Sequence, residues 1–367
     1  MPHIVIDNLK DIHYPQKLND VEFLFQAENL IGVKTESAKF LIKIIKKDQG
    51  FLIKYDKITR PIISEIKKVY LAFTKLHNAN IIFENINGIK EKLPNKNLIN
   101  ITDDLSNIDI IEVGFGSGRH LLYLAKENPN KTILGIEIHK PSIEQVLKRL
   151  SLEGIENVRI LNHDARIILS KIPSNQLEAI YVHFPVPWDK KPHRRVINKD
   201  FISESIRTLK ENGFLHLRTD SENYFNYSLN EFLNFKKIEL NVKKNIPYAV
   251  SSKYEDRWKR MNKNIYDIYM INHEKSPDLK EEFDFSFDTK LRNLDFKPKI
   301  YDNFVIHIEK VFKINENEEL IRLTLGNFNR PEHVYILNKE NPVYFKMPAP
   351  IKDNYLAHKE LKRLFNG

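Results

Sequence analysis

Apolar runs alternate with amphipathic segments between about residue 108 and residue 272, a pattern typical of a parallel α/β sheet. Five of these runs predict buried strands: residues 109–113, 132–137, 158–161, 177–184 and 214–219. The later segments KKIELNV and IYDIYMI predict a hairpin at an edge of the sheet. We therefore expect an open α/β sheet in the middle of the chain.

A helix is predicted directly after the second strand. Pro141 suits its first turn, and Ile143, Leu147 and Leu150 share one face at helical spacing. Gly154 suits the C-terminal cap of this helix.

The two flanks show a different pattern. The N-terminal part holds the strand-like runs VEFLFQ and FLIKYD and the helix-like IISEIKKVYLAFTKL, and the C-terminal part holds FVIHIEKVF, ELIRLTLGNF and the basic helix candidate LAHKELKRLF. The charged stretch 273–284 is the best linker candidate. We expect an N-terminal α+β extension (1–104), a central domain (105–272) and a β-rich C-terminal extension (273–367), the extensions being small β-containing regions of unassigned role.

A glycine-rich loop, EVGFGSG, connects the first predicted strand to a helix. Glu112 stands at its start, and Gly114, Gly116 and Gly118 follow at alternate positions. Glycines there permit positive φ and let a ligand approach the backbone closely. By itself the loop also fits a tight strand-to-helix turn that binds nothing.

Two further acids favour a nucleoside ligand at this loop. Glu137 ends the second strand, about 20 residues after the loop, where a carboxylate can accept both ribose hydroxyls. Asp164 follows the third strand in NHDA, where it can reach the exocyclic amine of an adenine. The dinucleotide fingerprint needs its third glycine one position later, where this chain has Arg119. The order E-x-G-x-G-x-G instead resembles the first motif of class I methyltransferases, which implies S-adenosylmethionine as the ligand. Glu112 would be poorly placed beside a pyrophosphate but suits the cationic methionine group of that ligand, so S-adenosylmethionine is favoured over a dinucleotide.

The segment HFPVPWDKKPHRRV, residues 183–196, follows the fourth strand and therefore belongs at the ligand-binding edge of the sheet. Its prolines stiffen the loop. Trp188 can stack on a base or pack the corner of the loop. Four cations suit a clamp for phosphates, although a solvated surface loop is the alternative; they are Lys190, Lys191, Arg194 and Arg195.

The charge balance favours a polyanionic partner but also fits a solvated lysine surface. The 367 residues include 58 Lys and Arg against 49 Asp and Glu, a formal net charge of +9. The chain has no cysteine, which excludes disulfides and thiolate zinc sites and fits a reducing cytoplasm. The first residues do not form a signal peptide, and no apolar run reaches the length that spans a bilayer. We expect a soluble, cytoplasmic monomer without a metal.

In order, these motifs resemble the bacterial tRNA (guanine-N7-)-methyltransferase family. The matching pieces are EVGFGSG, GIEIH, the DA of NHDA, FPVPWDKKPHRR, TD at 219–220 and SKYE at 252–255, and they cover about residues 108–272. The resemblance implies a Rossmann-like class I methyltransferase sheet. It implies S-adenosylmethionine as methyl donor and N7 of a tRNA guanosine, in the variable loop, as acceptor.

The resemblance also implies roles for single residues. Glu112, Glu137 and Asp164, with the glycines of the loop, would bind S-adenosylmethionine. The tRNA guanosine would contact Lys190, Asp220 and the segment that holds Ser252, Tyr254 and Glu255. Asp220 and Glu255 are the expected catalytic residues, since they could accept hydrogen bonds from guanine N1 and N2 and stabilise the growing cation. Asp220 could instead cap the next helix, or Ser221 could do so.

Val186 stands where the family usually has an aspartate, and Ser252 stands where it usually has a threonine. Guanine N7 has a free lone pair and no proton, so its alkylation needs no general base, and catalysis should come from proximity and electrostatics. We therefore expect activity despite Val186. The alternatives are a methyltransferase that acts on another RNA and a non-catalytic RNA-binding relative.

Overall fold

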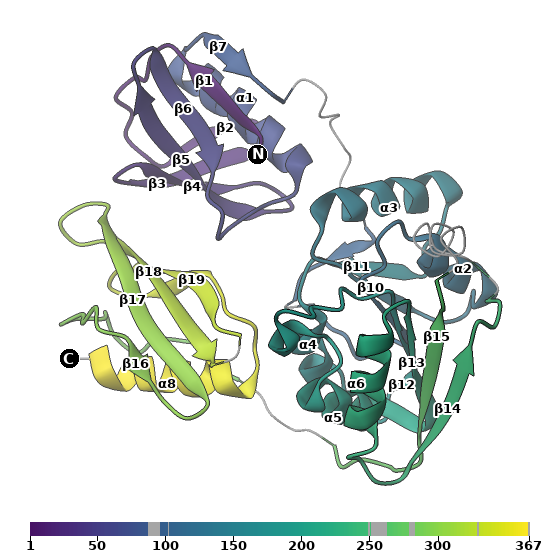
Figure 1. The fold of residues 1–367 in the computed structure, drawn as a ribbon. Helices are drawn as coiled ribbons and strands as arrows, with labels where there is room; N and C mark the ends of the chain where they lie inside the picture. Colours follow the sequence, from purple (N-terminus) through teal and green to yellow (C-terminus); the bar gives the residue numbers. More distant parts are fainter. Residues whose placement is uncertain are drawn as a thin grey trace. The chain divides into compact units, whose positions relative to one another are not determined.

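The chain folds into two compact units. The computed structural model describes residues 1–86, 96–101, 103–248, 250, 263–278, 283–328 and 330–365. One unit is Asn95–Glu282, and the other combines Met1–Pro94 with Phe283–Gly367 (Figure 1). The two flanks of the sequence thus belong to the same unit, and the second boundary falls inside the charged stretch 273–284.

The central unit is built on an eight-stranded sheet in the order β14-β15-β13-β12-β9-β10-β11-β8. The strands are β8 (Leu98–Ile99), β9 (Ile110–Val113), β10 (Ile133–Ile136), β11 (Val158–Leu161), β12 (Leu177–His183), β13 (Leu209–Thr219), β14 (Ile238–Lys244) and β15 (Tyr266–Asn272). Strands β8 to β13 run parallel, and β15 runs antiparallel to both β13 and β14. The five predicted strands and the edge hairpin are therefore confirmed.

Helices cover both faces of this sheet, which explains why its strands are apolar on both sides. Residues of α2 (Arg119–Glu127) and α3 (Lys140–Glu153) share one buried cluster. Residues of α4 (Ala165–Ile168), α5 (Lys199–Thr208) and α6 (Glu222–Phe232) share a cluster with the other face, where Figure 1 shows these helices side by side. Helix α3 has Pro141 in its first turn and ends at Gly154 with φ of 65°, as predicted.

The second unit contains two antiparallel sheets. The first has the order β2-β3-β4-β5-β6-β1-β7, and the second runs in sequence from β16 to β20. The strands are β1 (His3–Ile6), β2 (Gln16–Leu18), β3 (Val21–Ala27), β4 (Leu30–Lys34), β5 (Lys39–Lys47), β6 (Gly50–Tyr55), β7 (Ile81–Glu84), β16 (Lys299–Ile300), β17 (Phe304–Lys313), β18 (Glu319–Asn327), β19 (Glu332–Asn338) and β20 (Val343–Lys346). Helix α1 (Ile63–His77) packs on the first sheet and α8 (Lys352–Phe365) on the second.

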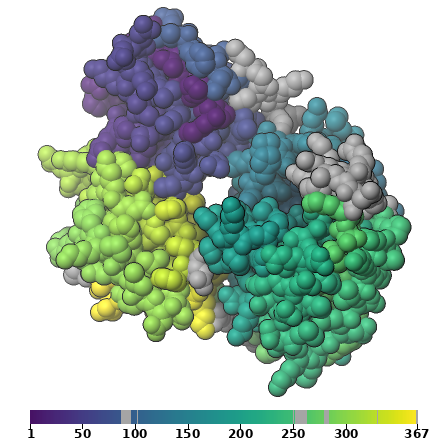
Figure 2. All heavy atoms as spheres, viewed as in Figure 1, coloured from purple at the N-terminus to yellow at the C-terminus, as the bar shows by residue number. Residues whose placement is uncertain are grey.

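A further buried cluster contains residues from both of these sheets, including Phe25, Leu41, Leu320 and Phe345. Phe25 and Phe345 meet edge to face, with ring centroids 5.4 Å apart. Side chains fill the space between strands and helices within each unit (Figure 2). None of the described helices has the length and apolar composition needed to cross a membrane.

Candidate functional site

The glycine loop between β9 and α2 has the backbone that its sequence predicts. Gly114, Gly116 and Gly118 have φ of 69°, 50° and 70°. A Cβ atom at Gly118 would come within 2.3 Å of Val146 Cγ2, so close helix packing requires glycine there. A Cβ atom at Gly114 would meet no atom within 4 Å, so the backbone at that position borders open space. A ligand can therefore approach the loop closely.

A small cavity of about 60 Å³ lies beside this loop. Its lining comprises Glu112, Gly114, Phe115, Gly116, Ser117, Arg119, His120, His183, Phe184 and Val250. Glu112 is 3% exposed, and its Oε2 lies 3.2 Å from Nδ1 of the buried His120. That oxygen makes no hydrogen bond among the described residues. A buried carboxylate that needs a donor fits the ammonium group of a methionine moiety. The cavity is smaller than S-adenosylmethionine and accounts for one part of that ligand.

Glu137 is tied to the glycine loop. Its Oε2 accepts a hydrogen bond from the Gly116 N–H at 3.0 Å, and its Oε1 accepts from the N–H groups of Ile138 and His139 at 2.8 and 2.9 Å. The carboxylate thus holds the loop against the end of β10. Its predicted contact with a ribose would use the remaining lone pairs of the same two oxygens.

Asp164 caps α4, and its carboxylate is engaged by Arg166. Its Oδ1 accepts a hydrogen bond from the Arg166 N–H at 3.1 Å, and the Arg166 guanidinium bonds both carboxylate oxygens at 3.1 and 3.0 Å. Asp164 does not line the cavity beside the glycine loop. The predicted bond to an adenine amine stays a prediction.

The loop after β12 places an aromatic ring and several cations in solvent. Phe184 and Trp188 both have positive φ, 49° and 46°, which is strained for large side chains. Trp188 is 37% exposed, and the Arg194 guanidinium lies 5.1 Å from its ring centroid. Lys190 and Lys191 are also exposed. Val186 is 59% exposed, so it is not part of the core.

Arg195 is buried, which corrects its assignment to the phosphate clamp. Its Nε donates to the Pro187 carbonyl at 2.8 Å, and its guanidinium lies over the ring of Tyr227 and 3.3 Å from Asp189 Oδ1. Only 3% of the residue is exposed, so a phosphate in solvent cannot reach it. Arg195 therefore holds the loop against α6. This contact could not be predicted from the sequence, because the aromatic partner belongs to a helix that follows about 30 residues later in the chain.

A chain of two histidines that was not predicted from the sequence adjoins the cavity; His216 is fully buried and His183 partly buried. Nε2 of His183 lies 3.0 Å from Nδ1 of His216, whose Nε2 lies 2.8 Å from Asp267 Oδ1. The Arg218 guanidinium donates to both Asp267 oxygens at 2.6 Å. Burial, with His216 as the next cause, holds the pKa of His183 well below its usual value. The imidazole of His183 is therefore uncharged at neutral pH, and it lines a cavity that we expect to hold a cation.

Tyr248 connects His120 to His183 and His216. Its hydroxyl lies 3.4 Å from His120 Nε2, and its ring contacts both His183 and His216. Burial raises the pKa of Tyr248, so its hydroxyl keeps its proton. In the sequence, His183 directly before FPVPW was the only hint of these contacts. That it lies beside His216 and Tyr248 could be known only from the register of the strands.

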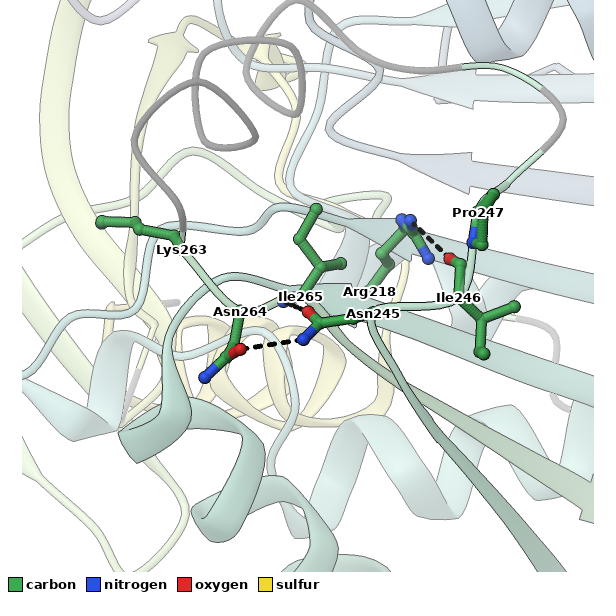
Figure 3. Close-up of a pocket in the computed structure, with 7 residues that line it drawn as sticks. All are labelled: Arg218, Asn245, Ile246, Pro247, Lys263, Asn264 and Ile265. Carbon is green, nitrogen blue, oxygen red and sulfur yellow. Dashed lines mark hydrogen bonds between the residues drawn. The ribbon is translucent and has the colours of Figure 1, made fainter.

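A larger cavity of about 310 Å³ lies where β13 ends and the β14–β15 hairpin opens (Figure 3). It is lined by Arg218, Asn245, Ile246, Pro247, Lys263, Asn264 and Ile265. In Figure 3 the side chains of Asn245 and Asn264 face each other, and Asn245 Nδ2 donates to Asn264 Oδ1 at 2.9 Å. The volume and the amide groups suit a small polar ligand.

Asp220 follows β13 and reaches the residues of this cavity through an ion pair. Its Oδ2 lies 3.1 Å from Lys263 Nζ. Ser221, not Asp220, caps α6, because Ser221 Oγ accepts the hydrogen bond from the Tyr224 N–H at 3.2 Å. The Asp220 carboxylate thus does not serve as the N-cap of α6. The predicted residues Ser252, Tyr254 and Glu255 lie outside the described residues.

The sheet order, the glycine loop at the carboxyl end of β9 and the cavity beside it define a class I S-adenosylmethionine-dependent methyltransferase. A family model described as "Putative methyltransferase" matches residues 106–268. The crystal structure of the 16S rRNA methyltransferase KamB is 12% identical to this chain, with a TM-score of 0.37; the match covers 47% of this chain and 89% of KamB.

Within this class, the chain belongs to the tRNA (guanine-N7-)-methyltransferase family. The tRNA (guanine-N(7)-)-methyltransferase of Campylobacter jejuni subsp. jejuni serotype O:23/36 (strain 81-176) is 41% identical, covering 99% of this chain and 98% of the relative. The enzyme of that name from Wolinella succinogenes is 38% identical over 99% of each chain. The Helicobacter pylori enzyme is 36% identical, covering 100% of this chain and 99% of its own. The likeness therefore includes both flanks.

Proposed function

We propose that this protein transfers a methyl group from S-adenosylmethionine to N7 of a guanosine in tRNA. The observation that carries the proposal is 41% identity over 99% of the chain to a relative named for this activity. The glycine loop and the open acceptor on Glu112 support it, because they fit the backbone approach and the ammonium group of the methyl donor.

When bound, S-adenosylmethionine supplies an electrophilic methyl group on a sulfonium. The guanine N7 lone pair forms the new carbon–nitrogen bond while the carbon–sulfur bond breaks with its electrons on sulfur. No proton is lost, so the protein needs no general base. Its task is to hold the two reactants in line and to stabilise the cation that develops on the guanine ring.

Two features of the site support that task. The uncharged His183 lines the cavity beside the glycine loop without repelling a sulfonium. Asp220 lies at the carboxyl end of β13, where a carboxylate can accept hydrogen bonds from guanine N1 and N2. We propose that the cavity of Figure 3 receives the guanine, and that Asp220 exchanges its partner Lys263 for the base.

Trp188 and Arg194 fit a substrate that must leave the tRNA interior. A base drawn out of the tRNA fold needs a surface on which its neighbours can stack. The exposed indole of Trp188, with the guanidinium of Arg194 over it, offers such a surface. The exposed Lys190 and Arg194 form the phosphate clamp in this proposal, without Arg195.

The proposal is tested by incubating the purified protein with labelled S-adenosylmethionine and total tRNA and digesting the product to nucleosides. We expect label in N7-methylguanosine alone. Label in another nucleoside would assign a different methyl acceptor. A protein that binds both substrates but gives no labelled nucleoside would be a non-catalytic RNA-binding relative.

A further inference from the structure

The first sheet of the flanking unit has one face that is only partly covered. Side chains alternate between the two faces of a strand, so the residues on each face follow from the register. Ile4, Ile42 and Ile53 point to the face under α1 and are fully buried. On the opposite face, Phe25 and Leu41 pack in the cluster shared with the second sheet.

The rest of that opposite face is formed by β5, β6, β1 and β7. Lys43 pairs with Lys54, and Lys54 pairs with His3, which puts three basic side chains in one row across three strands. One pair further along, Ile45 lies opposite Leu52, and Leu52 lies opposite Val5. These three apolar side chains are partly exposed and pack against none of the buried clusters of the described residues.

An exposed lysine and an exposed aromatic ring extend these rows. Lys47 lies on the same face, opposite Gly50 at the end of β5, and is exposed. Phe83 of β7 lies opposite Val5, is 51% exposed, and stacks on His3 with ring centroids 5.4 Å apart. We call the surface made by His3, Lys43, Lys47, Lys54 and Phe83 the basic sheet face.

The charges of the basic sheet face are not balanced within the fold. Lys43, Lys47 and Lys54 form no ion pair with a described residue. Like charges directly opposite each other on neighbouring strands destabilise a sheet, so the pair of Lys43 and Lys54 is destabilising in the absence of a bound anion. Strands β1, β5 and β6 contain no acidic residue, and Glu84 of β7, which pairs with Ile4, points to the α1 face. The whole unit has 29 Lys and Arg against 23 Asp and Glu.

We propose that the basic sheet face is a second contact surface for the phosphate backbone of the tRNA substrate. Lysines spaced along a sheet neutralise successive phosphates, and partly exposed apolar and aromatic groups between them contact sugars and bases. A polyanion also relieves the repulsion between Lys43 and Lys54, which a neutral or basic protein partner would not. The identity of the RNA in this inference rests on the proposed function, whereas the surface itself is inferred from the structure alone.

The test uses the full-length protein with Lys43, Lys47 and Lys54 all changed to Gln. The matched control changes Lys75, Lys297 and Lys313, three exposed lysines away from this face, to Gln. The dissociation constant of tRNA is measured for both variants over a range of salt concentrations. The tRNA KM and the single-turnover methylation rate at saturating tRNA are measured at one salt concentration.

We expect the basic-sheet-face variant to bind tRNA about tenfold more weakly at moderate salt. Its log–log salt slope should be smaller by about 0.7–0.9 for each phosphate that the variant no longer neutralises. The tRNA KM should rise, whereas the single-turnover rate at saturating tRNA should stay at the wild-type value, because none of the three lysines lines either cavity of the central unit. The control variant should keep the wild-type slope.

An unchanged slope, or an equal change in the control variant, would overturn the inference. Sedimentation of the wild type and both variants without RNA tests whether the surface binds a second copy of the chain instead. If the wild type is a dimer and only the basic-sheet-face substitutions dissociate it, the RNA assignment is wrong. Failure of the proposed function would look different. The wild type would then form no N7-methylguanosine, while the smaller salt slope of the variant could still be observed.

Discussion

At the scale of single residues, Glu112 and the histidine chain give the central unit its chemical character. Glu112 is buried with an acceptor oxygen that no described residue satisfies, which is costly unless a ligand supplies the donor. His183 and His216 are held uncharged by burial, although the Asp267 carboxylate opposes this effect at His216. The cavity lining thus holds the buried carboxyl group of Glu112 and the uncharged ring of His183, together with Arg119. Of these groups, the Glu112 carboxyl is the one that fits a cationic ligand.

Replacing Glu112 by Gln should weaken binding of S-adenosylmethionine by about 1.5–3 kcal/mol, about 10- to 150-fold in the dissociation constant, because a charge-assisted hydrogen bond is removed. Calorimetry with two ligands makes the test specific. 5′-Methylthioadenosine lacks the amino-acid end, so its affinity should not change. An equal loss of affinity for both ligands would show that the substitution disturbs the whole site and would remove Glu112 from its assigned role.

The histidine chain predicts a pH dependence of stability. Because the pKa of His183 and that of His216 are lowered in the folded protein, the unfolded chain binds more protons below its ordinary histidine pKa of about 6.5. The free energy of unfolding should therefore fall as the pH drops from 7.5 to 5.5. Urea unfolding at both pH values should show a smaller fall for His183→Asn than for the wild type. Equal falls would contradict the assigned protonation state.

At the scale of elements, the loop after β12 shows what sequence reasoning reaches and where it stops. The strands were predictable because they are short and apolar on both faces, and the first turn of α3 was predictable from Pro141. The positions of Glu137 and Gly116 at one sheet edge followed from the parallel order, and their hydrogen bond agrees with it. The sequence did not predict that Arg194 is exposed while Arg195 is buried. Burial of an arginine depends on which aromatic residues, distant in the sequence, pack beside it.

The two neighbouring arginines form a matched pair for mutation. Arg195→Gln should lower the free energy of unfolding by about 1–3 kcal/mol, because the Pro187 carbonyl and the rings of Tyr224 and Tyr227 lose a buried partner. Arg194→Gln should change stability by no more than about 0.5 kcal/mol. It should instead reduce the log–log salt slope of tRNA binding by about 0.7–0.9.

Urea unfolding and tRNA titration of both variants separate these effects. Similar losses of unfolding free energy in the two variants would contradict the buried role of Arg195. An unchanged salt slope of tRNA binding in Arg194→Gln would contradict the phosphate contact of Arg194.

At the scale of the whole molecule, the two flanks of the chain share one unit, and the central unit lies between them in the sequence. No hydrophobic pattern could show this, because periodicity identifies strands but not which strands from opposite ends of a chain share a core. The cluster that contains Phe25 and Phe345 decides it. Relatives that match 98–99% of their own length carry both flanks too, so the flanking unit accompanies the methyltransferase unit in these proteins.

The central claim concerning this protein is a methyl transfer in which the protein positions its substrates and moves no proton. The most direct test is the single-turnover rate of N7-methylguanosine formation, with saturating tRNA and S-adenosylmethionine, measured from pH 6.5 to 8.5. We predict a nearly constant rate, since N7 gives up no proton and burial keeps His183 and His216 uncharged in this range. A rate that rises about tenfold for each pH unit would demand a general base and would contradict the account, as would the absence of N7-methylguanosine at every pH.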